Sequence, residues 1–237
     1  ITNVGASDFQ QNQQDAQAAL KNVVGLMRSL RAKSDAEQVS PSEGGQPSPE
    51  VDKYSEDELT EGLSALQALS TSVDLENPVS LMDRVQENLV QGTDDEKEID
   101  ENQKVAIDVV DRFFFSMRNN PRLSSEAKQH LLKLEVPVLK VLLKDERFFE
   151  DHNSSVRAVM NRIAQLGAKG SKLNPSSRKK VSELVHKIVD QFEEDTQIFD
   201  SVLSELDQLI DRQNQHYVKN VERVAATADG VFKVEEA

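Results

Sequence analysis

The side chains best suited to binding chemistry are basic residues gathered in one short segment. Residues 169–180 contain no acid and five cations: Lys169, Lys172, Arg178, Lys179 and Lys180. Asn174-Pro175, in the same segment, is typical of a helix N-cap followed by proline at the first helical position. Cations beside the free N–H groups of a helix start can hold a phosphate. One hypothesis is therefore a sensor of a phosphate-bearing small ligand, a nucleotide or second messenger; the alternative is a solvated basic loop. This segment has no aromatic residue that could stack on a base, so we do not predict nucleic-acid binding.

Histidine and carboxylate pairs are the other candidates for chemistry. Glu183 and His186 have the spacing used on the helices of di-iron bundles, but such a site needs two of these motifs and two further carboxylates. His130 follows Glu126 by four residues, which predicts a pair on a helix surface. We interpret His152 as a hydrogen-bonding residue of a turn and His216 as part of a polar helix face. We therefore predict no catalytic residue, no metal and no cofactor.

Composition limits the class of protein. The 237 residues include 42 acids, 28 Lys and Arg and no Cys, and the net charge is −14. Without Cys there is neither a disulfide nor a thiolate ligand, which fits a cytoplasmic protein. There is no apolar run of about 18 residues, so we predict no membrane span. Most of the excess acid lies in residues 35–61 and 94–101, which we interpret as solvated spacers.

Apolar spacing predicts an all-α chain, either a multi-helix bundle or a solenoid-like stack of antiparallel helix pairs. Residues 1–33 form an N-terminal helix in this reading, with an apolar stripe from Leu20 to Leu30. Residues 34–54, rich in Pro, Gly, Ser and acid, are predicted to be a disordered linker. Residues 55–237 form the helical domain. Because the chain starts at Ile1 and apolar residues continue to its end, we expect a fragment of a longer protein.

Within the helical domain we expect a core at 97–194 and a long C-terminal helix over 196–228. A capping box at Ser55 and Glu58 opens the first helix, and Asn77-Pro78 opens the second. Residues 131–143 are apolar almost all round, which indicates burial on several sides. Pro137 lacks a backbone donor, so this stretch must kink near Lys133 or divide into two abutting helices. The other helices are predicted at 56–70, 97–118, 153–166 and 174–194.

Two features suggest a surface for a protein partner. Phe113, Phe114 and Phe115 cannot all face one way on a helix, so Phe115 either packs on a neighbouring helix or belongs to a partner surface. In the last helix, Ile198, Val202, Leu206 and Leu209 are expected to pack on the preceding helix. Beyond Ile210 the apolar pattern stops and then resumes, which predicts a surface for self-association, for the N-terminal helix or for another protein: Tyr217, Val218, Val221 and Val224.

Residues 131–149, LLKLEVPVLKVLLKDERFF, and residues 156–167, VRAVMNRIAQLG, resemble the central signature of a proteobacterial domain of unknown function, family 1631. The resemblance extends over about 55–210. It departs from the family at the turn His152–Arg157, at Glu135, where glutamine is usual, and at Leu142, which replaces a small residue. The resemblance implies a long cytoplasmic protein with no established activity, although some members carry a thymidine phosphorylase label.

The enzyme label can be compared with the residues. Phosphorolysis needs a cradle for inorganic phosphate, usually Gly-rich backbone N–H groups with cations, and this chain has no Gly-rich loop. The sequence therefore predicts a non-enzymatic helical scaffold or adaptor that binds a protein partner, with the phosphate-ligand sensor as the alternative.

Overall fold

The structure is a computed structural model that describes residues 52–69, 75, 79–92, 97–145, 151, 153–171 and 173–235. The side chains described exclude those of residues 91, 92, 216, 217, 220–222 and 224–235. The predicted N-terminal helix, most of the predicted linker and Lys172 lie outside the described residues. None of the described helices combines the length and the apolar character that a membrane span requires.

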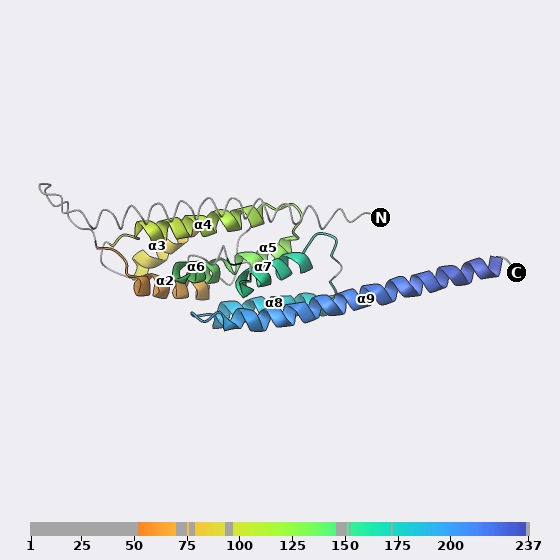
Figure 1. Cartoon of the computed structure of the whole chain (residues 1–237). Helices are drawn as coiled ribbons and strands as arrows, with labels where there is room; N and C mark the ends of the chain where they lie inside the picture. The colour runs from red at the N-terminus through yellow and green to blue at the C-terminus, as the bar shows by residue number, and fades with distance from the viewer. Residues whose placement is uncertain are drawn as a thin grey trace, which may run out of the picture.

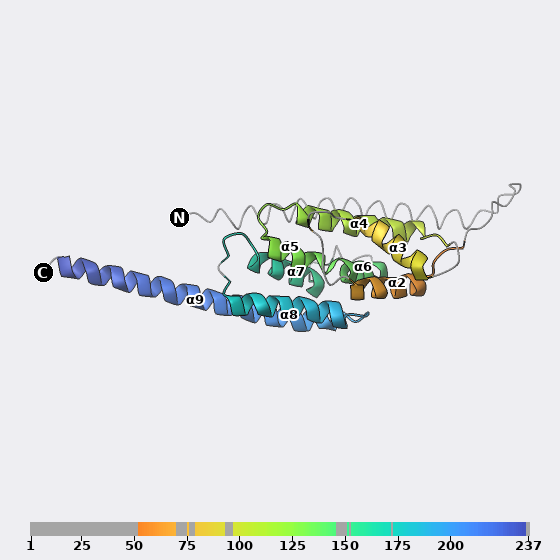
Figure 2. The same ribbon diagram turned by 180° about the vertical axis from the view of Figure 1, so that it is seen from behind.

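The described residues form an all-α bundle, as predicted. Its only extended pairings there are two isolated bridges, Lys53 with Glu98 and Leu123 with Ala168. The helices are α2 (Glu56–Leu69), α3 (Leu81–Gly92), α4 (Glu101–Arg118), α5 (Ser125–Leu132), α6 (Glu135–Lys144), α7 (Ser155–Leu166), α8 (Pro175–Gln191) and α9 (Gln197–Glu235). Figures 1 and 2 show three layers, with α3 and α4 on one side, α2, α5, α6 and α7 in the middle, and α8 and α9 on the other side. The packing of α4 on α6 and of α7 on α9 joins the layers.

Polar side chains cap the N-termini of α2 and α8. At α2 the backbone N–H of Ser55 donates to Glu58 Oε2 at 2.8 Å and that of Glu58 donates to Ser55 Oγ at 3.2 Å, which is the predicted capping box. At α8 the side chain of Asn174 accepts from Ser177 N at 2.7 Å, and Pro175 is the first helical residue. Local capping chemistry therefore fixes both starts.

The start of α3 differs from the prediction. We expected Asn77-Pro78 to open this helix, but it begins at Leu81, where Ser80 Oγ accepts from Asp83 N at 3.1 Å. The N–H of Leu81, which has no partner within its own helix, donates to Asp111 Oδ1 of α4 at 3.1 Å. The local cap at Ser80 and a tertiary hydrogen bond to α4 thus both stabilise the start of this helix at Leu81.

The apolar stretch 131–143 divides into two abutting helices, which was one of the two outcomes expected from Pro137. Helix α5 ends at Leu132, and α6 begins at Glu135. Pro137 is the third residue of α6, where a backbone N–H would have no partner inside the helix. The proline is therefore accommodated without loss of a helical hydrogen bond.

The described part of the chain begins at Asp52 and includes the last three residues of the predicted linker, 52–54. Glu98 N donates to Asp52 O at 2.8 Å, Tyr54 N donates to Glu98 O at 3.0 Å, and the Tyr54 side chain is only 5% exposed. The two acidic segments lie side by side here, and Lys97 contacts Glu58 Oε1 at 2.5 Å. This contact and hydrogen bonds from Ser55 lower the pKa of Glu58 to about 2. Part of the acid interpreted as spacer is therefore paired within the fold.

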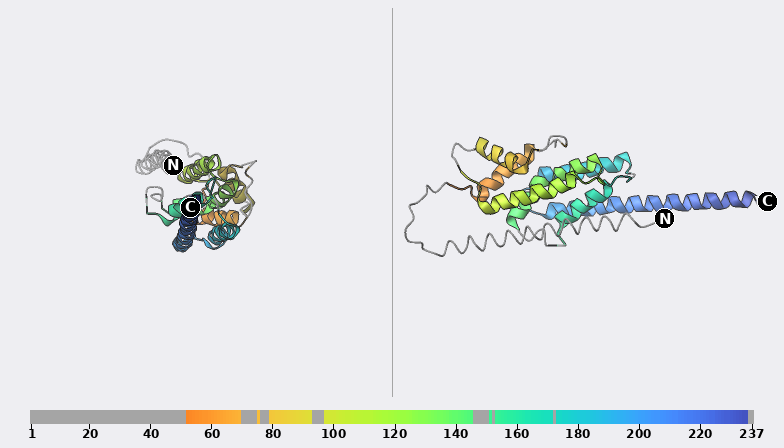
Figure 3. Two further views of the ribbon diagram at one scale, coloured as in Figure 1. Left: turned by 90° about the vertical axis from the view of Figure 1, so that its right-hand side faces the viewer. Right: turned by 90° about the horizontal axis from the view of Figure 1, so that it is seen from above.

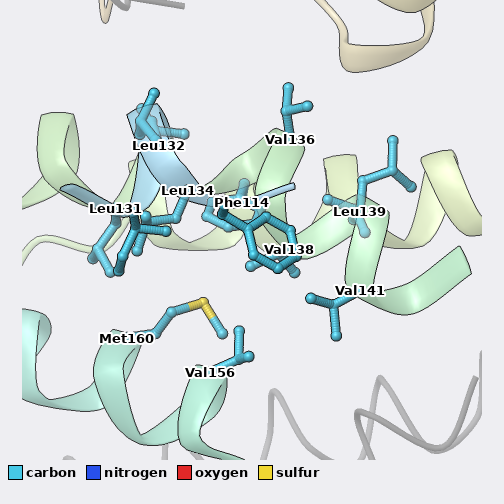
Figure 4. Packing of buried hydrophobic residues seen from close by; sticks show 14 of the residues in the cluster. Phe114, Leu131, Leu132, Leu134, Val136, Val138, Leu139, Val141, Val156 and Met160 are labelled. Carbon is cyan, nitrogen blue, oxygen red and sulfur yellow. The ribbon is translucent and has the colours of Figure 1, made fainter. Parts of the chain in front are cut away.

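The core extends beyond the predicted 97–194. Phe114 is fully buried and belongs to the same apolar cluster as Val138 of α6 and Met160 of α7 (Figure 4). Leu139 is also fully buried, in agreement with the expected burial of 131–143. Further buried residues come from outside the predicted core, on α2, α3 and α9: Leu59, Leu63, Leu66, Leu81, Val85, Leu89, Phe199, Val202, Leu206 and Leu209.

Candidate functional site

The first part of α9 is held firmly on the bundle. Phe199, Val202 and Leu206 are fully buried, and the Phe199 ring meets that of Phe192 edge to face with centroids 5.2 Å apart. We expected Ile198 in this stripe, but it is only partly buried and Phe199 takes the inward position. The main neighbour of α9 is α7, in addition to the predicted α8. Arg162 of α7 pairs with Asp207 across this interface at 2.5 Å.

The second part of α9 leaves the bundle. Gln213 donates to Ser171 Oγ at 3.5 Å. Beyond this residue α9 extends past the end of α8 as one continuous helix (Figures 1 and 3). The helix ends at Glu235, seven residues later than predicted. Residues 214–235 span about 33 Å at 1.5 Å per residue. The bundle thus holds one end of a helix whose other half projects from it, and residues 214–235 are called the projecting segment below.

The apolar stripe of the projecting segment does not continue the stripe that packs on the bundle. Continued at the same spacing, Val202, Leu206 and Leu209 would lead to five polar residues: Gln213, His216, Asn220, Arg223 and Thr227. A second stripe begins instead at Ile210, one residue and about 100° further round the helix. It contains Tyr217, Val221, Val224, Ala228 and Val231.

The predicted partner residues fall in this segment. Tyr217, Val221 and Val224 belong to α9, although their side chains are outside those described. Val218 is described, and 53% of its surface is exposed. The structure thus brings these four residues together on one projecting helix.

A groove of about 1300 Å³ lies where α9 leaves the bundle. It is lined by the first turns of α8, the loop before α8 and α9 around Ile210. Gly170 in this loop has φ of 90°, a left-handed conformation that favours glycine. Ser177 and Arg212 add polar groups to the lining, so the base of the projecting segment adjoins a polar hollow.

The predicted basic cluster does not converge on this groove. Lys179 and Lys180 line it, whereas Arg178 lines a small cavity on the other side, next to His130. Successive residues on a helix are about 100° apart, which separates these neighbours. Lys169 is exposed in the loop, and its N–H donates to Arg122 O at 2.7 Å.

The two predicted cations that line the groove, Lys179 and Lys180, have carboxylate partners. Lys180 contacts Glu205 of α9 at 2.7 Å, and Lys179 lies 3.8 Å from Glu183. Lys187 also contacts Glu205, at 3.3 Å. The hydrogen bond from Lys180 is the main cause that lowers the pKa of Glu205, and Lys187 adds to it. Lys180 and Lys187 therefore join α8 to α9 through Glu205, whereas the pair of Lys179 lies within α8.

The three successive phenylalanines of α4 do not face the same way, as the 100° turn per residue of a helix requires, and Phe115 is the exposed one. Phe114 is buried, and Phe113 packs against it edge to face at 5.2 Å. Phe115 is 56% exposed, so of the two expected placements, packing on a neighbouring helix is wrong. Its ring lies 5.4 Å from the guanidinium carbon of Arg118. It comes from α4, in a different layer from α9 (Figure 1).

The histidine pairs have structural surroundings. His186 Nδ1 lies 2.7 Å from Ser182 O, and Lys133 Nζ is 3.1 Å from its Nε2. His130 is only 8% exposed, so its prediction as a surface residue was wrong. Burial lowers the pKa of His130, while Glu126 at 3.8 Å raises it in part. Among the described residues no three His, Cys, Asp or Glu side chains gather as metal ligands would.

Sequence reasoning missed two buried charges in α6. Lys140 donates to Ser64 Oγ at 3.0 Å, and its ammonium lies 5.4 Å from the centre of the Phe192 ring. Glu135 pairs with Arg84 of α3. Burial raises the pKa of Glu135, whereas Arg84 opposes the change. The sequence does contain a signal for these two residues, because both are charged within an otherwise apolar stretch and a buried charge needs a partner.

Comparison with known families bears on this fold. The sequence profile of the second domain of the proteins of unknown function DUF1631 matches residues 53–195. The chain belongs to this family. The matched segment begins within the bridge that opens the folded part and ends before α9, so α9 lies outside it. No curated protein and no solved structure matches the chain.

Proposed function

We propose that the protein is a non-enzymatic helical scaffold or adaptor module that binds a protein partner along the projecting segment of α9. The observation that carries this proposal is the second apolar stripe, which begins at Ile210 and continues beyond the last turns held by the bundle. A helix that extends about 33 Å from its bundle gains no stability from the core. An apolar face on such a helix is instead suited to a helical partner.

The bundle supplies a rigid base in this proposal. Phe199, Val202 and the pair Arg162–Asp207 fix the direction in which α9 leaves the bundle. A fixed direction lowers the entropy lost on binding, because the projecting helix is ordered before its partner arrives. A cytoplasmic, bacterial setting is part of the proposal.

A photo-reactive amino acid at Val221 tests this proposal in cells. Irradiation is expected to attach Val221 to a second polypeptide, either another protein or another copy of the chain. Lys219 is the matched control, because it is exposed and lies off the apolar stripe. Equal labelling from both positions, or none from Val221, would contradict the proposed surface.

The alternative, a sensor of a phosphate-bearing ligand at residues 169–180, stays a prediction. The contacts of Lys180 with Glu205 and of Lys179 with Glu183 leave less cationic charge for an anion. A thermal shift measurement with ATP and with inorganic phosphate tests it. A rise in Tm that is lost on Lys179→Ala would favour the sensor, and assays of thymidine phosphorolysis test the enzyme label.

A further inference from the structure

The apolar stripe of the projecting segment has the spacing of a coiled coil. From Ile210 to Val231, seven positions recur at alternating intervals of four and three residues over 22 residues of continuous helix, and all of them except Asn214 are apolar. In heptad notation Ile210, Tyr217, Val224 and Val231 take d positions, and Asn214, Val221 and Ala228 take a positions. Asn214 is the one amide in this stripe, and a polar residue at an a position commonly sets the register of a coiled coil.

A second segment of this chain repeats the same pattern. Residues 9–30 lie outside the described residues, but their sequence contains 22 residues with the same alternating intervals. The d positions are Phe9, Ala16, Val23 and Leu30, and the a positions are Gln13, Leu20 and Met27. The amide Gln13 occupies the second position of this series, as Asn214 does in the other.

The two amides determine the relative direction of the segments. In a parallel pair a faces a and d faces d, so Gln13 can lie opposite Asn214. In an antiparallel pair a faces d, and every d position of both segments is apolar. Each antiparallel register would therefore leave both amides against apolar side chains, which costs free energy when a polar group loses its partners.

The parallel register also matches large residues with small ones. It sets Ala16 opposite Tyr217 and Met27 opposite Ala228, and it pairs Leu20 with Val221. A pair made of two projecting segments would instead set Tyr217 against itself and Ala228 against itself. Overpacking at one position and a cavity at another both destabilise an interface. The projecting segment therefore fits residues 9–30 better than it fits a second projecting segment.

The length of the linker, residues 31–51, indicates that the residues 9–30 that pair with α9 come from a second copy of the chain. Lys53 and Glu194 line the same groove, so Asp52 lies at the end of the bundle where α9 begins (Figure 1). Val231 lies about 51 Å further along α9, at 1.5 Å for each of 34 residues. Residues 31–51 would have to span this distance if the pairing were within one chain. A relaxed chain of 21 residues spans about 25 Å, so such pairing would hold the linker at twice its relaxed span.

We propose that residues 9–30 of one copy pack in parallel along residues 210–231 of a second copy, and that the second copy reciprocates. A two-fold dimer with its two α9 helices antiparallel brings the end of each α9 near the residue 52 of the other chain. Each chain then gives its residues 9–30 to the other, so that the dimer contains two identical coiled coils and leaves no binding segment unpaired. This inference rests on the proposed function, because it names the occupant of the same surface.

Disulfide trapping tests the pairing directly, because the natural chain has no cysteine. Single variants Leu20→Cys and Val221→Cys are mixed in equal amounts and oxidised, and the products are separated without reductant. We expect a covalent dimer of twice the 26.5 kDa chain mass from the mixture. Each variant oxidised alone should remain monomeric on the gel. Lys219→Cys mixed with Leu20→Cys is the matched control and should give no dimer.

Other outcomes would overturn the proposal. A doubly substituted chain that links internally, with no dimer from the mixture, would mean pairing within one chain. A dimer from Val221→Cys alone would mean that two projecting segments pair. No link at Leu20, while a photo-reactive residue at 221 still labels a foreign protein, would remove this inference and leave the proposed function standing. If neither reaction occurs, both fail.

Discussion

A glycine at the end of α7 allows one test of the packing of α7 against α5. Gly167 lies where α7 approaches α5, and its carbonyl accepts from Ser124 N at 3.0 Å. Its φ of −95° is open to any residue, so the backbone does not require glycine here. A Cβ at residue 167 would, however, overlap the Cβ of Ala127 and lie 3.2 Å from its Cα.

Gly167→Ala is therefore expected to cost about 1–3 kcal/mol of unfolding free energy through overpacking. Ala127→Gly alone should cost about 1 kcal/mol, because glycine weakens a helix interior. The double variant removes the overlap, so we expect it to cost about as much as Ala127→Gly alone. The coupling between the two sites would then be about 1–3 kcal/mol.

Urea denaturation with an unchanged m-value measures these free energies. Gly170→Ala is the matched control, because a Cβ there would have no atom within 4 Å while φ is 90°. Its cost comes from the backbone alone, about 1–2 kcal/mol, and Ala127→Gly should not relieve it. If Gly167→Ala and Ala127→Gly add to within about 0.5 kcal/mol, the close approach of α5 and α7 is wrong.

Three further predictions concern the bundle. Leu139→Ala should cost about 2–5 kcal/mol in chemical denaturation, because Leu139 is fully buried. The pKa of Glu58 is lowered from 4.5 to about 2. Ionised Glu58 therefore stabilises the fold above pH 4.5, and this stabilisation is lost as the pH falls towards 2. Lys97→Met should weaken this pH dependence of stability in acid titrations followed by circular dichroism. Glu135→Ala should cost about 3–5 kcal/mol because it strands the charge of Arg84, whereas Arg84→Met with Glu135→Leu should be close to neutral.

Local chemistry accounts for what the sequence could predict of the fold. The cap at Asn174 and the capping box at Ser55 involve residues three apart, so both helix starts were correct to within one residue. The break at Pro137 follows from its missing donor. Helix α4 was expected from residue 97, but it begins at Glu101. Asp100 and Gln103 form a capping box there, a local signal that the prediction overlooked, while Glu98 pairs with Lys53.

The candidate site was predictable only in part. The pause after Ile210 correctly separated the bundle-packed half of α9 from its projecting half, because polar residues cannot extend a core stripe. Lys179 and Lys180 were predicted to belong to an anion site, but the sequence does not reveal the carboxylate partner of Lys180. Glu205, which pairs with Lys180, is 25 residues away and comes near only when α9 packs beside α8.

Sedimentation velocity on the variant Val221→Asp with Val224→Asp tests the central claim most directly, because these substitutions place charge on the apolar stripe of the projecting segment. We expect the association of the wild-type chain to be lost in the variant, with the far-UV circular dichroism and the urea midpoint of the bundle retained. A control variant, Lys219→Asp, should sediment as the wild type does. An unchanged sedimentation profile for the double variant would contradict the pairing of the projecting segment with a second copy of the chain.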